Sequence, residues 1–123
     1  MSNTGTRAVG TQYEKKAVRL LEKYGLRILD TNYHCRQGEI DIVAMEGERY
    51  VFVEVKYRSG LQYGVPEEAV SFAKQRKIIH AARVYLYRHG RGTDVPCRFD
   101  VITFYAGRVR WLRDAFELTG QDV

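Results

Sequence analysis

The amino-acid sequence predicts one α/β domain whose elements follow the order helix, three strands, helix, two strands (α-β-β-β-α-β-β). Three observations predict it. A chain of 123 residues suits one compact domain. Apolar residues recur at helical spacing in two segments, and segments rich in valine, isoleucine and aromatic residues lie between and after them. Hydrophobic residues make up 45% and charged residues 28%, which is typical of a globular domain and not of a disordered chain.

The first helix is expected from Thr11 to Tyr24, after a polar and flexible start over residues 1–9. Apolar side chains recur three and four residues apart, and Gly25 is a suitable helix stop. The expected stripe comprises Tyr13, Ala17, Leu20, Leu21 and Tyr24. We expect the domain to span residues 10–118 and residues 119–123 to form a tail.

The strands are expected at residues 26–33, 39–43 and 50–57, with a closing hairpin formed by residues 98–105 and 108–112 around Ala106-Gly107. Between them, Ser59–Val65 is expected to be a loop. Pro66 suits the first position of a helix that runs to Arg88 and ends at Gly90. The apolar stripe expected for this helix comprises Phe72, Ile79, Ala82 and Leu86.

Positive charge is concentrated in the second half of the chain. The whole chain carries a net charge of +5. Residues 56–113 contain 12 basic and 4 acidic side chains, whereas residues 1–55 contain 8 of each. Five tyrosines lie in the same basic region, and such a pattern is typical of a surface that binds nucleic acid. The alternative is a solvated, arginine-rich helix face.

The composition excludes several classes of protein. The longest apolar runs, such as Val51–Val53, are far too short to span a bilayer, and the first twenty residues lack the apolar core of a secretory signal. Cys35 and Cys97 stand far apart without a metal-binding pattern, so two reduced thiols are favoured over a disulfide. We therefore expect a cytoplasmic protein with no membrane partner.

The tight turn Glu46-Gly47-Glu48-Arg49 sets the register of the two central strands. A two-residue turn with glycine at its first central position is of type II′, and Glu46 then pairs with Arg49. The resulting cross-strand pairs are Asp41 with Glu54 and Glu39 with Lys56. Because side chains alternate along strands, these four are expected on one face, and the reverse face carries Ile40, Ile42, Val53 and Val55.

Two carboxylates directly opposite each other repel by about 0.2–1 kcal/mol, so this placement needs a reason. A divalent cation between Asp41 and Glu54 would reverse the sign of the interaction, and oxygen-only ligands favour Mg²⁺. Lys56 follows Glu54 on the same face, where an ammonium could assist a metal-bound water and a phosphate. The alternative is a solvated sheet face in which Glu39 and Lys56 form a salt bridge.

The segments Gly38–Ala44 (GEIDIVA) and Val51–Arg58 (VFVEVKYR) resemble the D…ExK signature of the PD-(D/E)XK, or restriction-endonuclease-like, nuclease superfamily. More narrowly, the chain resembles the bacterial YraN family and is similar to archaeal Holliday-junction resolvases. The resemblance covers nearly the whole chain. Its further matches are Gly10, Glu14, Asn32, Gly64–Pro66, Lys74 and Arg98–Ile102.

The resemblance implies a mixed central sheet flanked by helices and a nuclease that depends on Mg²⁺ or Mn²⁺. It implies that Asp41 and Glu54 bind the metal with the backbone carbonyl of Val55, and that Lys56 activates the water. By the same resemblance, Glu14 is a helix-borne acid in the outer metal shell, and Glu39 is adjacent to the site. Thr11–Tyr13 departs from the glycine- and tryptophan-like run expected before that acid.

Several residues retain a structural alternative. Glu14 could be an ordinary surface side chain, and the same holds for the candidate phosphate ligands Arg58, Lys74, Arg76 and Lys77. Arg98 and Asp100 are expected to form a structural pair. The expected function is endonucleolytic cleavage of DNA, including branched or structured DNA, by a symmetric homodimer. The alternatives are a nucleic-acid-binding module that does not cut and a basic adaptor protein.

Overall fold

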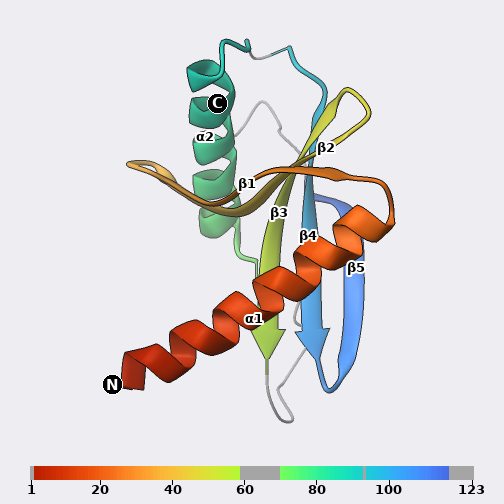
Figure 1. Ribbon diagram of the computed structural model, residues 1–123. Helices are drawn as coiled ribbons and strands as arrows, with labels where there is room; N and C mark the ends of the chain where they lie inside the picture. Colours follow the sequence, from red (N-terminus) through yellow and green to blue (C-terminus); the bar gives the residue numbers. More distant parts are fainter. Residues whose placement is uncertain (1, 59–69, 93, 117–123) are drawn as a thin grey trace.

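A five-stranded mixed sheet with one helix on each face forms the fold (Figure 1). The computed structural model describes residues 2–58, 70–92 and 94–116, without the side chains of residues 2–9 and 58. The elements, in chain order, are α1 (Ser2–Lys23), β1 (Arg27–Cys35), β2 (Gly38–Glu46), β3 (Arg49–Arg58), α2 (Phe72–Arg88), β4 (Cys97–Tyr105) and β5 (Arg108–Phe116). The predicted order of elements and the mixed sheet flanked by helices are therefore confirmed.

The strands lie in the spatial order β1-β2-β3-β4-β5. The β3–β4 pair is parallel, because α2 carries the chain from the end of β3 back to the start of β4. The other three pairs are antiparallel. This arrangement places β3 at the centre of the sheet, where it has a neighbour on each side.

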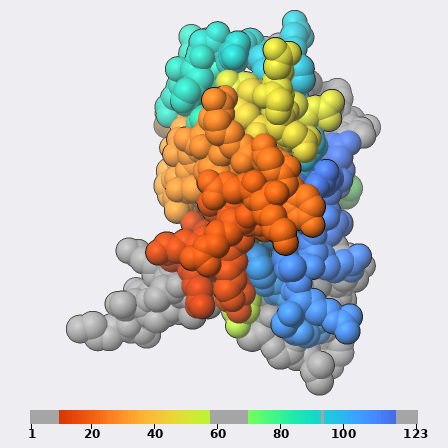
Figure 2. Space-filling view, turned by 45° about the vertical axis from the view of Figure 1, so that its right-hand side comes forward, coloured from red at the N-terminus to blue at the C-terminus, as the bar shows by residue number. Residues whose placement is uncertain are grey.

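Each helix buries its own cluster of apolar side chains against the sheet. Ala17 and Leu21 of α1 pack with Ile42, Val51 and Val53. The other face carries the α2 cluster, which includes Ile40, Val43, Phe52, Ile78, Ile79, Ala82, Tyr85 and Leu86. Burial on both faces explains the nearly continuous apolar sequence of β3. In Figure 2, α1 and β1 (red to orange) form one continuous surface, and β5 (blue) lies beside it.

The helix boundaries differ from those predicted. The start of the first helix at Thr11 was wrong, because the described backbone is already helical from Ser2. The second helix begins at Phe72: Ser71 has an extended ψ of 162°, and its side chain accepts the Lys74 N–H at 3.2 Å. Phe72 therefore lies outside the apolar stripe and is 80% exposed. The predicted loop Ser59–Val65, the helix start at Pro66 and the tail at 119–123 lie outside the described residues.

Both hairpin turns follow from their residues. Gly47 has a φ of 60° whereas Glu48 does not have a positive φ, which fits the predicted type II′ turn. Ala106 and Gly107 both have positive φ values, 52° and 74°, as a type I′ turn requires. The first of these turns sets the β2–β3 register that positions the candidate site.

A buried ionic network joins β4 to β5 and, across β3, to β2, and it contains the predicted Arg98–Asp100 pair. Asp100 is fully buried and accepts hydrogen bonds from Arg98 Nε, Trp111 Nε1 and the backbone N–H of Asp114. Arg98 also pairs with Glu46 of β2. Because both carboxylate oxygens of Asp100 accept hydrogen bonds within the fold, the Arg98–Asp100 pair is structural, as predicted. Neither described helix combines the length and the apolar character needed to cross a membrane.

Candidate functional site

Asp41 of β2 and Glu54 of β3 lie side by side where the backbone pairing of their strands ends. The pairing runs from Glu46–Arg49 to Ile42–Val53, which is the register predicted from the turn. Beyond it, the Asp41 side chain takes the place of a backbone acceptor: its Oδ2 accepts the Val55 N–H at 2.8 Å. The Asp41 carboxyl is thereby held against β3, where it is hydrogen-bonded to the carboxyl of Glu54.

The two carboxyl groups share one proton in the absence of a metal. Glu54 is only 5% exposed. Burial and the neighbouring Glu54 carboxyl raise the pKa of Asp41 from 3.8 to about 8. Burial would also raise the pKa of Glu54, but the hydrogen bond from Asp41 and the ammonium of Lys74 outweigh it and hold that pKa below its usual value. At neutral pH the pair therefore holds one proton, because the pKa of Asp41 is raised and that of Glu54 is lowered.

Two lysines face the ionised carboxylate. Lys74 Nζ, from the first turn of α2, lies 2.6 Å from Glu54 Oε2, and Lys56 Nζ lies 3.7 Å from the same oxygen. Burial and the nearby Lys74 ammonium lower the pKa of Lys56. Burial opposes the charge of Lys74 as well, but contact with Glu54 raises its pKa above the usual value. Lys56 is therefore the more easily deprotonated of the two.

Glu14 reaches the border of this cluster from α1. Asn32 Nδ2 donates a hydrogen bond to Glu14 Oε1 at 2.8 Å, and the charge of Glu14 contributes to the raised pKa of Asp41. Asn32 has a left-handed φ of 54°, which asparagine tolerates better than most residues. It was not among the predicted site residues, although an asparagine inside a strand is a signal for such a conformation.

The prediction that Glu39 joins the acidic face was wrong. Its side chain is 61% exposed and pairs with His34 Nδ1 at 3.1 Å. The strand changes face between Ile40, which packs on the α2 side, and Ile42, which packs on the α1 side. Asp41 lies at this change of face. Asn32 stands opposite it in β1, between the residues that pair with Ile42 and Ile40. Ile40 therefore does not share the reverse face predicted for it.

The remaining predicted ligands have different outcomes. Arg76 and Lys77 are exposed on α2, and the described contacts of the carboxyl pair do not include them. The side chain of Arg58 lies outside the described residues. The Val55 N–H points toward Asp41, and because the N–H and C=O of one strand residue point the same way, its carbonyl faces the same gap.

The carboxyl pair fits a hard divalent cation that keeps most of its waters. The described residues contain no group of three or more His, Cys, Asp or Glu side chains able to hold a metal ion. They offer instead two carboxylates, of which the buried Glu54 Oε2 is contacted by the ammonium groups of Lys74 and Lys56. Mg²⁺ is commonly bound through one or two carboxylates with water in the other positions. Asp41 and Glu54 therefore form an adequate donor set for Mg²⁺ or Mn²⁺, with the Val55 carbonyl nearby.

Comparison with known proteins gives one family. The sequence profile described as "Uncharacterised protein family UPF0102" matches residues 13–104, a span that contains the carboxyl pair and both lysines. A UPF0102 protein of Lachnoclostridium phytofermentans is 44% identical over 111 residues, covering 90% of this chain and 94% of that protein. A UPF0102 protein of Chromohalobacter salexigens is 41% identical over 120 residues, covering 94% of this chain and 96% of that protein. The UPF0102 protein YraN of Escherichia coli is 44% identical over 112 residues, covering 90% of this chain and 86% of its own length.

Proposed function

The chain belongs to the UPF0102 family, and we propose that it is a metal-dependent nuclease of the restriction-endonuclease-like superfamily that hydrolyses phosphodiester bonds in DNA. One observation carries this proposal. Two carboxyl groups from neighbouring strands are pressed together in a largely buried position, which raises the pKa of Asp41 to about 8. Perturbed groups of this kind cluster at functional sites, since folding alone gains nothing from such a pair.

The residues of the cluster divide the work of hydrolysis. Asp41 and Glu54 would hold Mg²⁺ or Mn²⁺, which supplies an activated water and neutralises charge developing on the phosphate. Lys56, with its lowered pKa and one-fifth exposed side chain, donates a hydrogen bond to the water or to a phosphate oxygen. Asn32 orients Glu14 at the border of the cluster.

Lys74 has a second role in this proposal. In the metal-free protein its ammonium balances the charge of Glu54 at 2.6 Å. Cation binding at the carboxyl pair would compete with that contact and free the ammonium for a phosphate oxygen. The basic second half of the chain would hold the DNA backbone through contacts that depend strongly on salt and little on sequence. A symmetric homodimer would supply two such sites, one for each strand.

A nucleic-acid-binding module that does not cut is the second candidate. The contact between Lys74 and Glu54 favours it, because a lysine can neutralise the carboxylate without a metal. Both candidates predict DNA binding that weakens with salt, but only the nuclease predicts a metal-dependent product.

Incubation with branched, single-stranded and duplex DNA in the presence of Mn²⁺ separates the two. We expect the wild type to cut at least one substrate, and Asp41→Asn and Lys56→Ala to lose the product while keeping DNA binding in an anisotropy titration. Glu39→Gln is the matched control, since it changes an exposed carboxylate two residues from Asp41 and should cut like the wild type. Binding without any Mn²⁺-dependent product from the wild type would exclude the nuclease and favour the binding module.

A further inference from the structure

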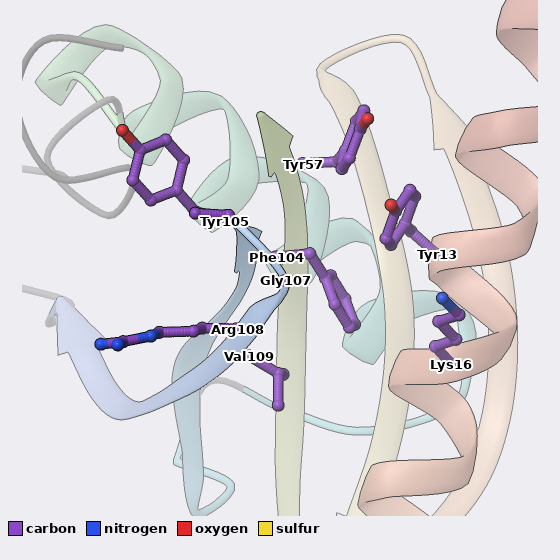
Figure 3. Close-up of a pocket in the computed structure, with 9 residues that line it drawn as sticks. Tyr13, Lys16, Tyr57, Phe104, Tyr105, Gly107, Arg108 and Val109 are labelled. Atoms are coloured by element: carbon purple, nitrogen blue, oxygen red, sulfur yellow. The ribbon is translucent and has the colours of Figure 1, made fainter. Parts of the chain in front are cut away.

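A second concave site lies on the α1 side of the sheet, near the end of β3. It is a cavity of about 260 Å³ between α1, β3 and the β4–β5 hairpin. Figure 3 shows the rings of Tyr13, Tyr57 and Phe104 gathered on one side of it, with Lys16 beside them and the turn that carries Arg108 on the other side. The volume is slightly below the usual range of small-molecule sites, about 300–1,000 Å³, so it suits one planar ring system.

The aromatic rings are arranged as a stacking surface. Tyr13 and Tyr57 stack with their centroids 4.1 Å apart and an interplanar angle of 20°, and Phe104 lies 4.9 Å from Tyr13. Tyr57 is 43% exposed although its ring is large and flat. An exposed aromatic face of this kind gains about 1–3 kcal/mol when a nucleobase stacks on it.

Positive charge lies at the rim of the cavity. Lys16 Nζ is 4.9 Å from the centre of the Tyr13 ring and its side chain is exposed, whereas the side chain of Arg108 points away from the rings (Figure 3). A ligand with a planar ring and an attached anion would therefore meet aromatic faces inside and the Lys16 ammonium at the entrance. A nucleotide has this combination of groups.

Two residues that line the cavity are next in sequence to residues of the carboxylate site, although the cavity lies on the opposite face of the sheet. Tyr13 immediately precedes Glu14 on α1, and Tyr57 immediately follows Lys56 on β3. Because successive strand residues point to opposite faces, Lys56 faces the α2 side and Tyr57 faces the cavity, with their Cα atoms only about 3.8 Å apart. A DNA strand crossing the end of β3 can thus have a phosphate at one site and a base at the other.

We propose that this cavity binds the base of an unpaired nucleotide in a DNA strand whose backbone runs past the carboxylate site. The proposal rests on the proposed function and narrows its substrate to DNA with a single-stranded or unstacked position. A base inside a duplex is already stacked on both faces and cannot enter, so full duplex DNA loses this contribution.

The test compares strands with and without bases. Anisotropy titrations in EDTA measure the binding of a labelled single strand and of the same strand with its bases replaced by abasic tetrahydrofuran sites. We expect the wild type to bind the base-bearing strand about 5- to 150-fold more tightly. Tyr57→Leu should abolish most of that difference by weakening only the base-bearing strand, and Tyr57→Phe should restore it. Tyr87→Leu, which changes a tyrosine 81% exposed on α2, is the control and should match the wild type.

The outcomes separate this inference from the proposed nuclease. Equal affinity of the wild type for the two strands, no measurable binding to either, or an unchanged difference in Tyr57→Leu overturns the stacking site. The metal site has its own readout, the rise in melting temperature with Mn²⁺, which Tyr57→Leu should keep. A protein that prefers base-bearing strands but shows neither a Mn²⁺ response nor cleavage would keep the stacking site and lose the nuclease.

Discussion

Replacement of Asp41 by asparagine measures the free-energy cost of the carboxyl pair while keeping the shape of the side chain. Asparagine has the same shape, its side-chain oxygen can still accept the Val55 N–H, and its amide can donate to Glu54. It therefore imitates the protonated Asp41 that the metal-free protein contains at neutral pH. Because asparagine carries no proton to lose, we expect Asp41→Asn to be more stable than the wild type without metal.

The magnitude follows from the pKa of Asp41, which is about 8 in the folded chain against a reference value of 3.8. Between pH 3.8 and pH 8 the folded state holds a proton that the unfolded state lacks. The free energy of unfolding therefore falls as pH rises through this range, by at most about 1.4 kcal/mol per pH unit. At pH 7 the limit for an isolated group is about 4 kcal/mol. The lowered pKa of Glu54 offsets part of this cost in the wild type. We therefore expect Asp41→Asn to be more stable than the wild type by about 1–2 kcal/mol, or about 3–8 °C in melting temperature.

Thermal and urea unfolding of the wild type, Asp41→Asn and the control Glu39→Gln between pH 4 and pH 8.5 measure this effect. The difference between wild type and Asp41→Asn should shrink toward pH 4, where Asp41 of the unfolded chain also begins to be protonated, and reach its maximum near pH 8. Added Mn²⁺ should stabilise the wild type and Glu39→Gln, increasingly as pH rises, because the metal needs the ionised pair. Asp41→Asn should not respond.

Two results would refute this reasoning. A wild type and an Asp41→Asn variant of equal stability at every pH would mean that the carboxyl pair carries no strain. Equal Mn²⁺ stabilisation of both proteins would place the metal elsewhere.

Three further substitutions test the supports of the site. Asp100→Ala removes the buried carboxylate partner of Arg98, which then keeps only Glu46, and it should cost about 3–5 kcal/mol in urea unfolding; a loss below about 1 kcal/mol would contradict the network. Gly38→Ala places a Cβ 2.9 Å from the backbone oxygen of Lys77 and should cost about 1–3 kcal/mol in the same assay; wild-type stability in this variant would contradict the close approach. Ser71→Ala removes the cap of α2 and should lower stability by about 1 kcal/mol; unchanged stability would show that the cap contributes nothing.

Sequence reasoning succeeded where short-range rules apply. The turn around Gly47 determined the register of β2 and β3, and alternation from that turn placed Asp41 next to Glu54. It failed for Glu39, because the change of face beside Asp41 involves Asn32 of a different strand. Alternation counts positions along one strand and carries no information about a left-handed residue in its neighbour.

The helix predictions show the same limit. Ala17 and Leu21 are buried as their spacing predicted. Phe72 is exposed because Ser71 caps the helix one residue earlier, so the helix begins at Phe72, with the buried stripe further along. An apolar residue at helical spacing is buried only if it belongs to the part of the helix that packs on the sheet, and Phe72 lies before that part.

Tight turns, periodicity and strand alternation act over a few residues, so the order of the elements, the β2–β3 register and the acidic pair follow from local sequence patterns. The contact of Lys74 with Glu54 and the stacking of Tyr13 on Tyr57 follow from three-dimensional packing. Each of these contacts joins a helix to a strand distant in sequence. Their geometry depends on how the two helices pack on opposite faces of the sheet, which no local pattern specifies.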